Sequence, residues 1–208
     1  MRRKAVLFVD FNGVISQFPY WHSIREEAHS LHGYHEQIEE FLFRSNNHVF
    51  RNWMLGEYSA EDIHELLNEK IGVSKELLYQ QFILDCKKID ISSAILSAVS
   101  HLKRSCITVL STANTDAFER FILPEFQQLR DTFDFIDNSH AIGLLKSDCE
   151  GKYFLDRLRS LDVKPQDAWL IDDGEKNCEI FSNLGGSAHR VTNETEALQA
   201  LRLIRQSV

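Results

Sequence analysis

The chain has few cysteines and no long apolar run. No stretch is apolar for long enough to span a membrane. Residues 1–4, three of which are basic, lead into an apolar run that Asp10 interrupts, so we expect no signal peptide. The cysteines show no CxxC or other metal-binding spacing, which favours reduced, partly buried thiols and a cytoplasmic location. They are Cys86, Cys106, Cys149 and Cys178.

Positive charge is also scarce. The 31 acidic residues outnumber the 23 basic ones, for a formal net charge of -8. This balance makes nucleic acid an unexpected partner, but local charge at a site can still favour a small phosphorylated substrate. The 208 residues, 43% of them hydrophobic, allow one α/β domain with a modest insertion. Nothing in the pattern indicates an oligomeric state.

Two acidic sites each follow a short apolar run. Residues 5–9 lead into Asp10, and residues 168–171 lead into Asp172 and Asp173. Apolar runs of this length are typical of buried strands in a parallel sheet. Because ligands of an open α/β sheet bind at the carboxyl ends of its strands, we expect one shared acidic site. Its carboxylates would repel one another without a cation, and Mg²⁺ is the simplest occupant.

Other polar groups are predicted at the same edge. A third apolar run, residues 106–110, ends in Ser111 and Thr112, and Lys146 lies in a turn-like stretch before the Asp pair. An acidic nucleophile, a hydroxyl, an ammonium and a metal-binding Asp pair, in that order, resemble the four motifs of the haloacid dehalogenase (HAD) superfamily. Residues 121–125 and residues 175–177 also resemble the helical-cap phosphatase branch of that superfamily.

The resemblance covers nearly the whole chain and implies an α/β fold. This fold is a Rossmann-like, doubly wound parallel sheet with an inserted all-helical cap. Strand and helix signals alternate from Ile107 to Arg205, as in such a sheet, and the first helix after Ile107 is predicted at residues 115–129. The sequence between the first and second strands indicates helices. We therefore place the core at residues 1–15 and 89–208 and the cap at residues 16–88.

Helix signals recur along this insertion. Ser23 opens a capping box whose helix can end at Gly33, and Ser59 and Ser74 are candidate N-caps of two further helices. Residues 36–50 carry apolar side chains at nearly helical spacing. These patterns predict helices through most of the insertion.

The resemblance also implies roles for the acidic residues. Asp10 would attack phosphorus, form an aspartyl-phosphate and bind Mg²⁺. The backbone carbonyl of Asn12 and the side chains of Asp172 and Asp173 would complete the metal site. A carboxylate nucleophile splits hydrolysis into two easier steps.

Further candidates surround the predicted phosphoryl group. Ser111 and Lys146 would bind its oxygens. Gly13 would permit the backbone bend that leads away from the first strand. Gly13, Thr112 and Asn114 are candidate substrate contacts.

Asn12 departs from the family pattern, in which a second Asp protonates the leaving group and then activates water. A carboxamide cannot donate and recover a proton, and such catalysis is worth ~10²–10⁴ in rate. Three interpretations follow. The protein is a slow phosphatase, or one whose substrate leaves easily; it uses another residue, such as a cap histidine; or it binds without turnover.

Aromatic residues and histidines gather where the chain leaves the first strand. Tyr20, Trp21 and His22 follow Phe18 and Pro19 and can face the catalytic cleft, where stacking on a base or sugar would suit them. Packing between cap and core is an equally good interpretation. Three more histidines follow at three-residue steps, His29, His32 and His35. This spacing is only weak evidence for a metal site, and solvent-exposed side chains are the better interpretation.

These features predict a Mg²⁺-dependent phosphatase acting on a small phosphorylated metabolite, either a sugar phosphate or a nucleotide. Cap closure would exclude bulk water and select the substrate. The alternative is a catalytically impaired, phosphate-binding regulatory or interaction module. Dehalogenation is a weaker third possibility, since it would not need the Asp pair.

Overall fold

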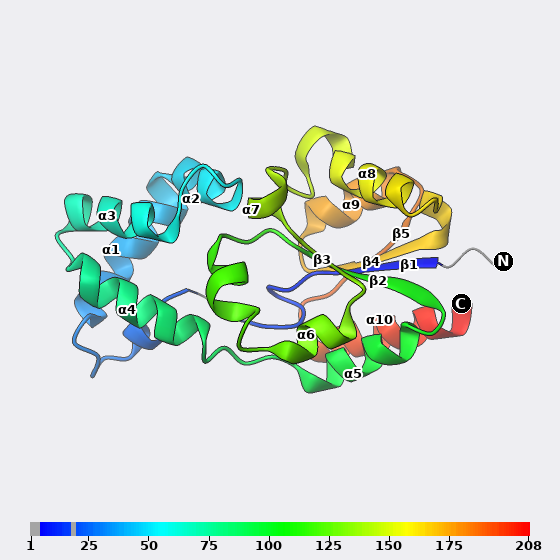
Figure 1. The fold of residues 1–208 in the computed structure, drawn as a ribbon, viewed down its shortest axis with the longest axis horizontal. Coiled ribbons are helices and arrows are strands. Elements are labelled where there is room, and N and C mark those ends of the chain that lie inside the picture. Colours follow the sequence, from blue (N-terminus) through cyan, green and yellow to red (C-terminus); the bar gives the residue numbers. More distant parts are fainter. Residues whose placement is uncertain (1–4, 18–19) are drawn as a thin grey trace.

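The computed structural model describes residues 5–17 and 20–208, and it contains a sheet of five parallel strands (Figure 1). The spatial order is β3-β2-β1-β4-β5. The strands are β1 (Ala5–Val9), β2 (Cys106–Thr112), β3 (Phe135–Asn138), β4 (Ala168–Asp172) and β5 (Ser187–Arg190). Successive strands are added first on one side of β1 and then on the other. The predicted doubly wound α/β fold is thereby confirmed.

The central strand β1 sets the register of the site. Its Val9 pairs with Leu110 of β2 on one side and with Ile171 of β4 on the other. The next residue, Asp10, donates its backbone N–H to the Ile171 carbonyl at 2.9 Å. Asp10 therefore lies between the ends of the two neighbouring strands, where the order of the strands reverses.

Alternating side chains of β1 pack on opposite faces of the sheet. Phe8 packs edge-to-face against Phe154 of α8 (Lys152–Ser160) and Phe181 of α9 (Glu175–Asn183), with ring centroids 5.3 and 5.7 Å away. Leu7 and Val9 belong to the apolar cluster of the other face. That face is covered by α5 (Ser93–Leu102), α6 (Gln127–Thr132) and α10 (Glu194–Ser207), which lie below the sheet in Figure 1.

Helices between β1 and α5 lie beyond the carboxyl edge of the sheet, at the left of Figure 1. They are α1 (His35–Glu39), a π-helix (Glu40–Ser45), α2 (Asn47–Met54), α3 (Ala60–Ile71) and α4 (Lys75–Cys86). As predicted, Ser59 and Ser74 cap α3 and α4 with their side chains. Ser59 also forms a complete capping box with Asp62.

The predicted helix from Ser23 to Gly33 is wrong. The structure has only short 3-10 helices there, His22–Arg25 and His32–Tyr34. The Ser23 N–H and hydroxyl both donate to the buried Asp85 of α4, at 3.1 and 2.9 Å, so the expected local cap is replaced by a tertiary contact. Tertiary bonds of this kind routinely override local helix signals.

Two other predicted helices are interrupted. Residues 36–50 divide into α1, the π-helix and α2. Residues 115–129 form a π-helix, Phe118–Ile122, followed by turns around Pro124 before α6 begins. Proline cannot continue a helix. The other short helices of this half are α7 (Ser139–Ile142) and two 3-10 helices, Asp148–Gly151 and Pro165–Asp167.

One apolar cluster extends from the sheet into the helical insertion. At its outer end, Trp21 and Trp53 pack around Phe82, with ring centroids 5.0 and 5.8 Å from that ring. The buried His64 lies among them. Its Nδ1–H donates to the Ala60 carbonyl at 2.6 Å, and its Nε2 accepts from the Trp21 indole at 3.3 Å. These two bonds use both ring nitrogens of a neutral imidazole.

We expect His64 to make the fold acid-sensitive. Burial lowers the pKa of His64 to about 4, from 6.5 for an ordinary histidine. Between these values the unfolded chain binds a proton that the folded chain does not, so stability is lost as the pH falls from 6.5 towards 4. Through this residue, the unfolding free energy should be ~2 kcal/mol lower at pH 5 than at pH 7 or above.

Urea unfolding at pH 7 and pH 5 measures this effect. The His64→Gln variant keeps a donor and an acceptor at this position but does not titrate. Its unfolding free energy should therefore fall less between pH 7 and pH 5 than that of the wild type. His48→Gln, at an exposed position, should behave like the wild type. Equal pH dependence in His64→Gln and the wild type would contradict the assignment.

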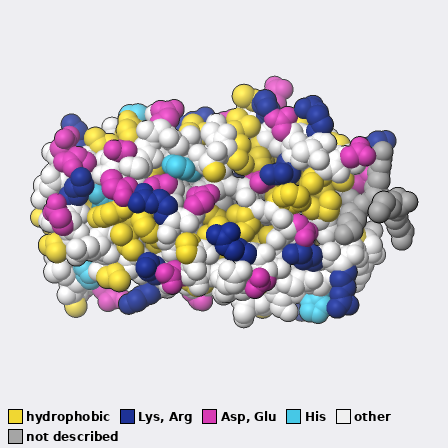
Figure 2. Space-filling view, viewed as in Figure 1, with side chains coloured by type: hydrophobic (Ala, Val, Ile, Leu, Met, Phe, Trp, Pro, Cys, Tyr) yellow, Lys and Arg dark blue, Asp and Glu magenta, His cyan; other side chains and the backbone are white. Residues whose placement is uncertain are grey.

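All four cysteines are free, and Cys149 is the exposed one. Within residues 5–17 and 20–208, no helix combines the length and apolar character needed to cross a membrane. On the face drawn in Figure 2, acidic and basic side chains intermingle with small apolar patches. That face presents no continuous basic stripe of the kind that binds nucleic acid.

Candidate active site

Three carboxylates converge at the carboxyl edge of the sheet. Asp10 follows β1, Asp172 ends β4 and Asp173 follows it. One oxygen from each can be chosen so that all three atoms lie within 4.8 Å of one another. Asp10 and Asp172 are buried, whereas Asp173 is exposed. The shared acidic site predicted from the two apolar runs is therefore present as a geometric cluster.

Lys146 bridges two of these carboxylates. Its Nζ lies 2.7 Å from Asp10 Oδ2 and 2.5 Å from Asp172 Oδ2, and it donates to the Ser111 carbonyl at 3.2 Å. The lysine is 4% exposed. Three carboxylates and one ammonium leave a formal excess of negative charge that a divalent cation would balance.

The electrostatics of the cluster follow from this burial. Burial raises the pKa of Asp10 to about 7, and the charges of Asp172 and Asp173 act in the same direction against that of Lys146. Burial alone would lower the pKa of Lys146, but the two neighbouring carboxylates outweigh it and hold this pKa above its usual range. A cation bound among the carboxylates would favour the ionised form of Asp10.

Neighbouring groups orient the carboxylates. Asp10 Oδ1 accepts the Phe11 N–H at 2.7 Å. Asp172 Oδ1 accepts the Gly174 N–H at 2.8 Å and the Asn177 side-chain amide at 2.9 Å. Asn177 belongs to the segment after the Asp pair that resembles the family, but neither Gly174 nor Asn177 is among the predicted site residues. Their place directly after the pair, at the start of α9, is the signal that the sequence offers.

Gly13 allows the close approach of Asp173. Its φ is +79°, and a Cβ at this position would lie 2.2 Å from Asp173 Oδ2. Both the backbone conformation and the space exclude a side chain. The sequence predicts Gly13 for its backbone freedom alone, whereas the structure adds a direct contact with the acidic cluster.

We expect Gly13→Ala to weaken divalent-cation binding by at least about tenfold. The new methyl group must displace the Asp173 carboxylate from the cluster, and losing one ligand reduces affinity. Titration of the purified protein with Mg²⁺ in a calorimeter measures the change.

Gly72→Ala is the matched control for this variant. Gly72 has a similar φ of +71°, but a Cβ there would meet no atom within 4 Å. It should therefore lose ~1 kcal/mol of stability to backbone strain and bind Mg²⁺ like the wild type. Equal affinities in Gly13→Ala and Gly72→Ala would contradict a role for the Gly13–Asp173 contact.

The donor set fits a hard divalent cation. All three carboxylates offer oxygen, the ligand atom that Mg²⁺ prefers. Asn12 Oδ1 and Thr112 Oγ1 are buried atoms that have no hydrogen-bond partner in the part of the chain described here. Buried polar groups without partners are uncommon. These atoms are therefore available to a ligand at this edge.

Ser111 lies near the carboxyl end of β2, on the same edge of the sheet and next to β3. It pairs with Asp137 in the sheet register, and its buried hydroxyl has no hydrogen-bond partner among the described residues. Tyr153 donates to Asp137 at 2.9 Å, and Arg157 binds both Asp137 oxygens. These contacts of the residue paired with Ser111 were not predicted, because they join different elements.

Three of the candidate substrate contacts are already engaged elsewhere. Asn114 Oδ1 accepts from the Tyr20 hydroxyl and from the Thr115 N–H. Trp21 is 1% exposed and donates its indole N–H to His64. Tyr20 thus contacts both the insertion and the loop after β2, whereas Trp21 packs against Phe82 and other residues of the insertion. Phe18 and Pro19 lie outside the described residues.

His22 lines a cavity of about 620 Å³ beside the two connections between the insertion and the core. One connection contributes Val14 and Gln17, and the other contributes Lys88 and Asp90. His29 contacts Gln81, His32 contacts the Ile24 carbonyl, and His35 accepts from Arg25. The three histidines therefore make separate contacts rather than one cluster.

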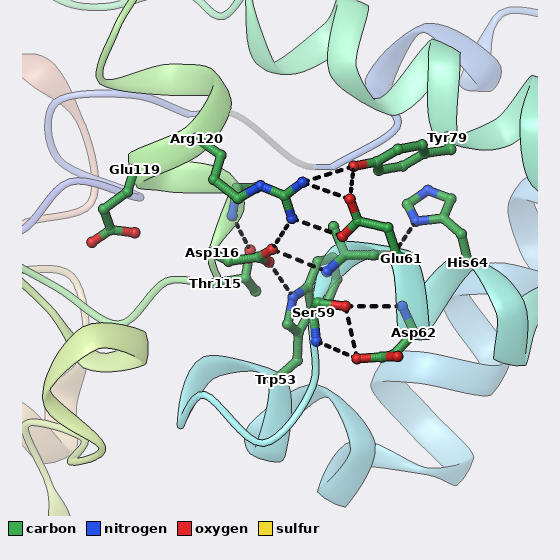
Figure 3. A network of polar contacts seen from close by, with 12 residues as sticks. Trp53, Ser59, Glu61, Asp62, His64, Tyr79, Thr115, Asp116, Glu119 and Arg120 are labelled. Atoms are coloured by element: carbon green, nitrogen blue, oxygen red, sulfur yellow. Dashed lines mark hydrogen bonds and ion pairs between the residues drawn. The ribbon is translucent and has the colours of Figure 1, made fainter.

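A polar network joins the insertion to the loop after β2 (Figure 3). The buried Asp116 accepts from the Trp53 indole at 2.6 Å and from the Ala60 N–H at 3.1 Å. Arg120 reaches from the π-helix to Asp116 at 2.6 Å and to Glu61 of α3. The insertion is thus seated on the core through charged groups as well as through the shared apolar cluster.

Comparison with known proteins defines the fold class. No family model and no curated protein matches the chain. A predicted HAD-like hydrolase from Porphyromonas gingivalis superimposes with a TM-score of 0.72 at 20% identity, over 98% of each chain. A HAD family enzyme from Bacteroides thetaiotaomicron, solved with magnesium and inorganic phosphate, gives a TM-score of 0.69 at 18% identity, over 92% of this chain and 96% of that one.

A third structure is more distant. The L-2-haloacid dehalogenase of Xanthobacter autotrophicus gives a TM-score of 0.63 at 16% identity, over 97% of this chain and 83% of that one. The fold is therefore that of the HAD-like hydrolases. At these identities the likeness defines the architecture alone.

Proposed function

We propose that this protein is a Mg²⁺-dependent phosphatase that acts on a small phosphorylated metabolite, such as a sugar phosphate or a nucleotide. The observation that carries the proposal is the cluster of Asp10, Asp172 and Asp173, with Lys146 bridging two of them. The structural neighbour with bound magnesium and phosphate supports the same chemistry.

In the proposed first step, a carboxylate oxygen of Asp10 attacks phosphorus. A bond forms between that oxygen and phosphorus, and the bond from phosphorus to the ester oxygen breaks. Lys146 and the Ser111 hydroxyl bind the phosphoryl oxygens, the lysine as a point charge. Water then hydrolyses the aspartyl-phosphate, which releases phosphate and restores Asp10.

Asp10, Asp172, Asp173 and the backbone carbonyl of Asn12 would hold Mg²⁺. Bound there, the ion would neutralise charge between an anionic nucleophile and an anionic substrate.

Asn12 affects proton transfer in both proposed steps, the departure of the leaving group and the attack of water. The leaving alkoxide takes its proton from water, from the substrate itself or from another side chain, because a carboxamide does not release one. The Asn12 side chain can still position water through hydrogen bonds. We therefore propose slow turnover, with phosphate esters of good leaving groups as the better substrates.

We further propose that residues 16–88 form a cap over a core made of residues 1–15 and 89–208. The insertion lies beyond the carboxyl edge of the sheet (Figure 1), and the acidic cluster lies at the same edge. A cap at that position would exclude bulk water and restrict the size of the substrate.

Phosphate release from sugar phosphates, nucleotides and p-nitrophenyl phosphate tests the function, with Mg²⁺ and with EDTA. We expect activity that requires Mg²⁺, and the panel would identify the substrate class. Release that persists in EDTA would contradict the proposal. Phosphate binding without release by any ester would favour the alternative, a phosphate-binding module, because Asn12 lacks acid–base function.

A further inference from the structure

Helix α2 contacts three different segments at the carboxyl edge of the sheet: the loop after β2, the start of α7 and the turn that carries Lys146. Its Trp53 indole binds Asp116, which follows β2, at 2.6 Å. The Met54 carbonyl accepts from Ser139, which follows β3, at 2.7 Å. Arg51 donates through NH2 to Asp148 Oδ1 at 2.9 Å. One helix of the insertion therefore fixes the position of the insertion against this edge.

The segment that Arg51 contacts is the turn that carries Lys146. Asp148 closes the turn twice, since its N–H donates to the Leu145 carbonyl and its Oδ2 accepts the Leu145 N–H, both at 3.1 Å. Lys146 lies inside the turn. Whatever holds the Asp148 carboxylate also restrains the backbone from which Lys146 extends.

Lys146 extends the same line of contacts to the catalytic carboxylates. Its Nζ contacts Asp10 and Asp172 and donates to the Ser111 carbonyl. The contacts thus run without a break from Arg51 through Asp148 and the turn to Asp10. They join an element of the insertion to the proposed nucleophile.

We propose that Arg51 is a positioning residue, which makes the placement of Lys146 depend on the seating of α2. When α2 is seated, Arg51 holds Asp148, the turn is fixed, and the ammonium lies between Asp10 and Asp172. When α2 moves away, the turn loses this restraint and the ammonium is less well placed. The kinetic part of this inference rests on the proposed function, whereas the structural part does not.

The ion pair itself contributes little to stability. Arg51 is 44% and Asp148 21% exposed in their side chains, and such pairs are worth little in water. A small error in the position of a catalytic group, by contrast, can cost a large factor in rate. Loss of the pair should therefore be seen in Lys146 and in turnover rather than in the melting temperature.

The geometry of the Arg51–Asp148 pair predicts which substitution at Arg51 keeps Lys146 in place. Only NH2 of Arg51 bonds Asp148, and NH1 has no hydrogen-bond partner among the described residues. A lysine at this position can supply the single bond that is used. Arg51→Lys should therefore behave like the wild type, whereas Arg51→Met removes the contact and keeps the length of the side chain.

The experiment combines NMR of the lysine ammonium groups with kinetics. In wild type, the buried Lys146 Nζ should give a slowly exchanging ¹H–¹⁵N signal, assigned by its loss in Lys146→Arg. Arg51→Met should broaden or shift this signal and lower kcat for p-nitrophenyl phosphate about tenfold, with the melting temperature within about 3 °C of wild type. Arg51→Lys should restore both. Asp148→Asn tests the same contact from the other side.

Lys87→Met is the matched control. Lys87 pairs with Glu125 at 3.3 Å, joins the end of α4 to the core and has the same 44% exposure, but it does not contact the Lys146 turn. It should leave the Lys146 signal and kcat unchanged. An unaltered Lys146 signal in both Arg51→Met and Asp148→Asn would overturn the inference. If the wild type hydrolyses no ester, the proposed function fails, and the NMR signal still decides whether Arg51 positions Lys146.

Discussion

The Asp10→Asn variant is expected to lose Mg²⁺-dependent phosphate release by a factor of at least about 10³. Its carboxamide has the shape of the carboxylate but cannot form the acyl-phosphate, and removing a nucleophile removes the pathway that depends on it. The measurement is the rate of phosphate release at saturating substrate and Mg²⁺. Mass spectrometry of the acid-quenched protein should detect a phosphorylated peptide containing residue 10 in the wild type and none in the variant.

Asp167→Asn is the control for this substitution. It also removes one carboxylate, but from an exposed position directly before β4, at the opposite edge of the sheet. It should turn over like the wild type. If Asp10→Asn retained activity while its fold was intact, another group would have to attack phosphorus, and the proposed mechanism would be wrong.

The Asn12→Asp variant is expected to gain activity, by ~10²–10⁴ in kcat. A carboxyl group at this position can protonate the leaving oxygen and then accept a proton from the attacking water. The gain should be largest for alkyl phosphates, whose leaving groups need a proton, and smallest for p-nitrophenyl phosphate. Comparing the two substrate types separates acid–base catalysis from a general change in binding.

The double variant Asp10→Asn with Asn12→Asp should be inactive, because the added acid helps only if the original nucleophile is present. No gain in Asn12→Asp for any ester would mean that another step limits turnover. A silent wild type, with activity appearing in Asn12→Asp, would mean an intact core without its acid–base group. That result would favour a binding or regulatory role.

The sequence predicts the central strands of the sheet well because each is marked by a local run of apolar residues. The apolar runs ending at Asp10, Ser111 and Asp172 need no tertiary information to be read as buried strands, and the rule for parallel sheets brings their ends together. Ser59 and Ser74 are correct N-caps for the same reason, since capping depends on residues within one turn. The predicted cluster of carboxylates follows from these local signals.

The failures lie where a distant residue decides the local structure. Ser23 carries a good capping signal, but its N–H and hydroxyl are taken by Asp85 on another helix. Trp21 precedes the predicted helix and has a left-handed φ of 52°, which turns the chain into the interior of the insertion. The contact of Gly13 with Asp173 and that of Arg51 with Asp148 join segments far apart in sequence. A single sequence gives no signal for such pairs.

The central place of β1 in the sheet also constrains how the protein is made. Val9 pairs with Leu110 on one side and with Ile171 on the other, so both neighbours of β1 are synthesised long after it. A nascent chain therefore carries a strand with one edge unpaired until β4 has left the ribosome, and contacts of such wide sequence separation form slowly. Exposed strand edges promote aggregation. The sheet around β1 can therefore be completed only after most of the chain has been synthesised.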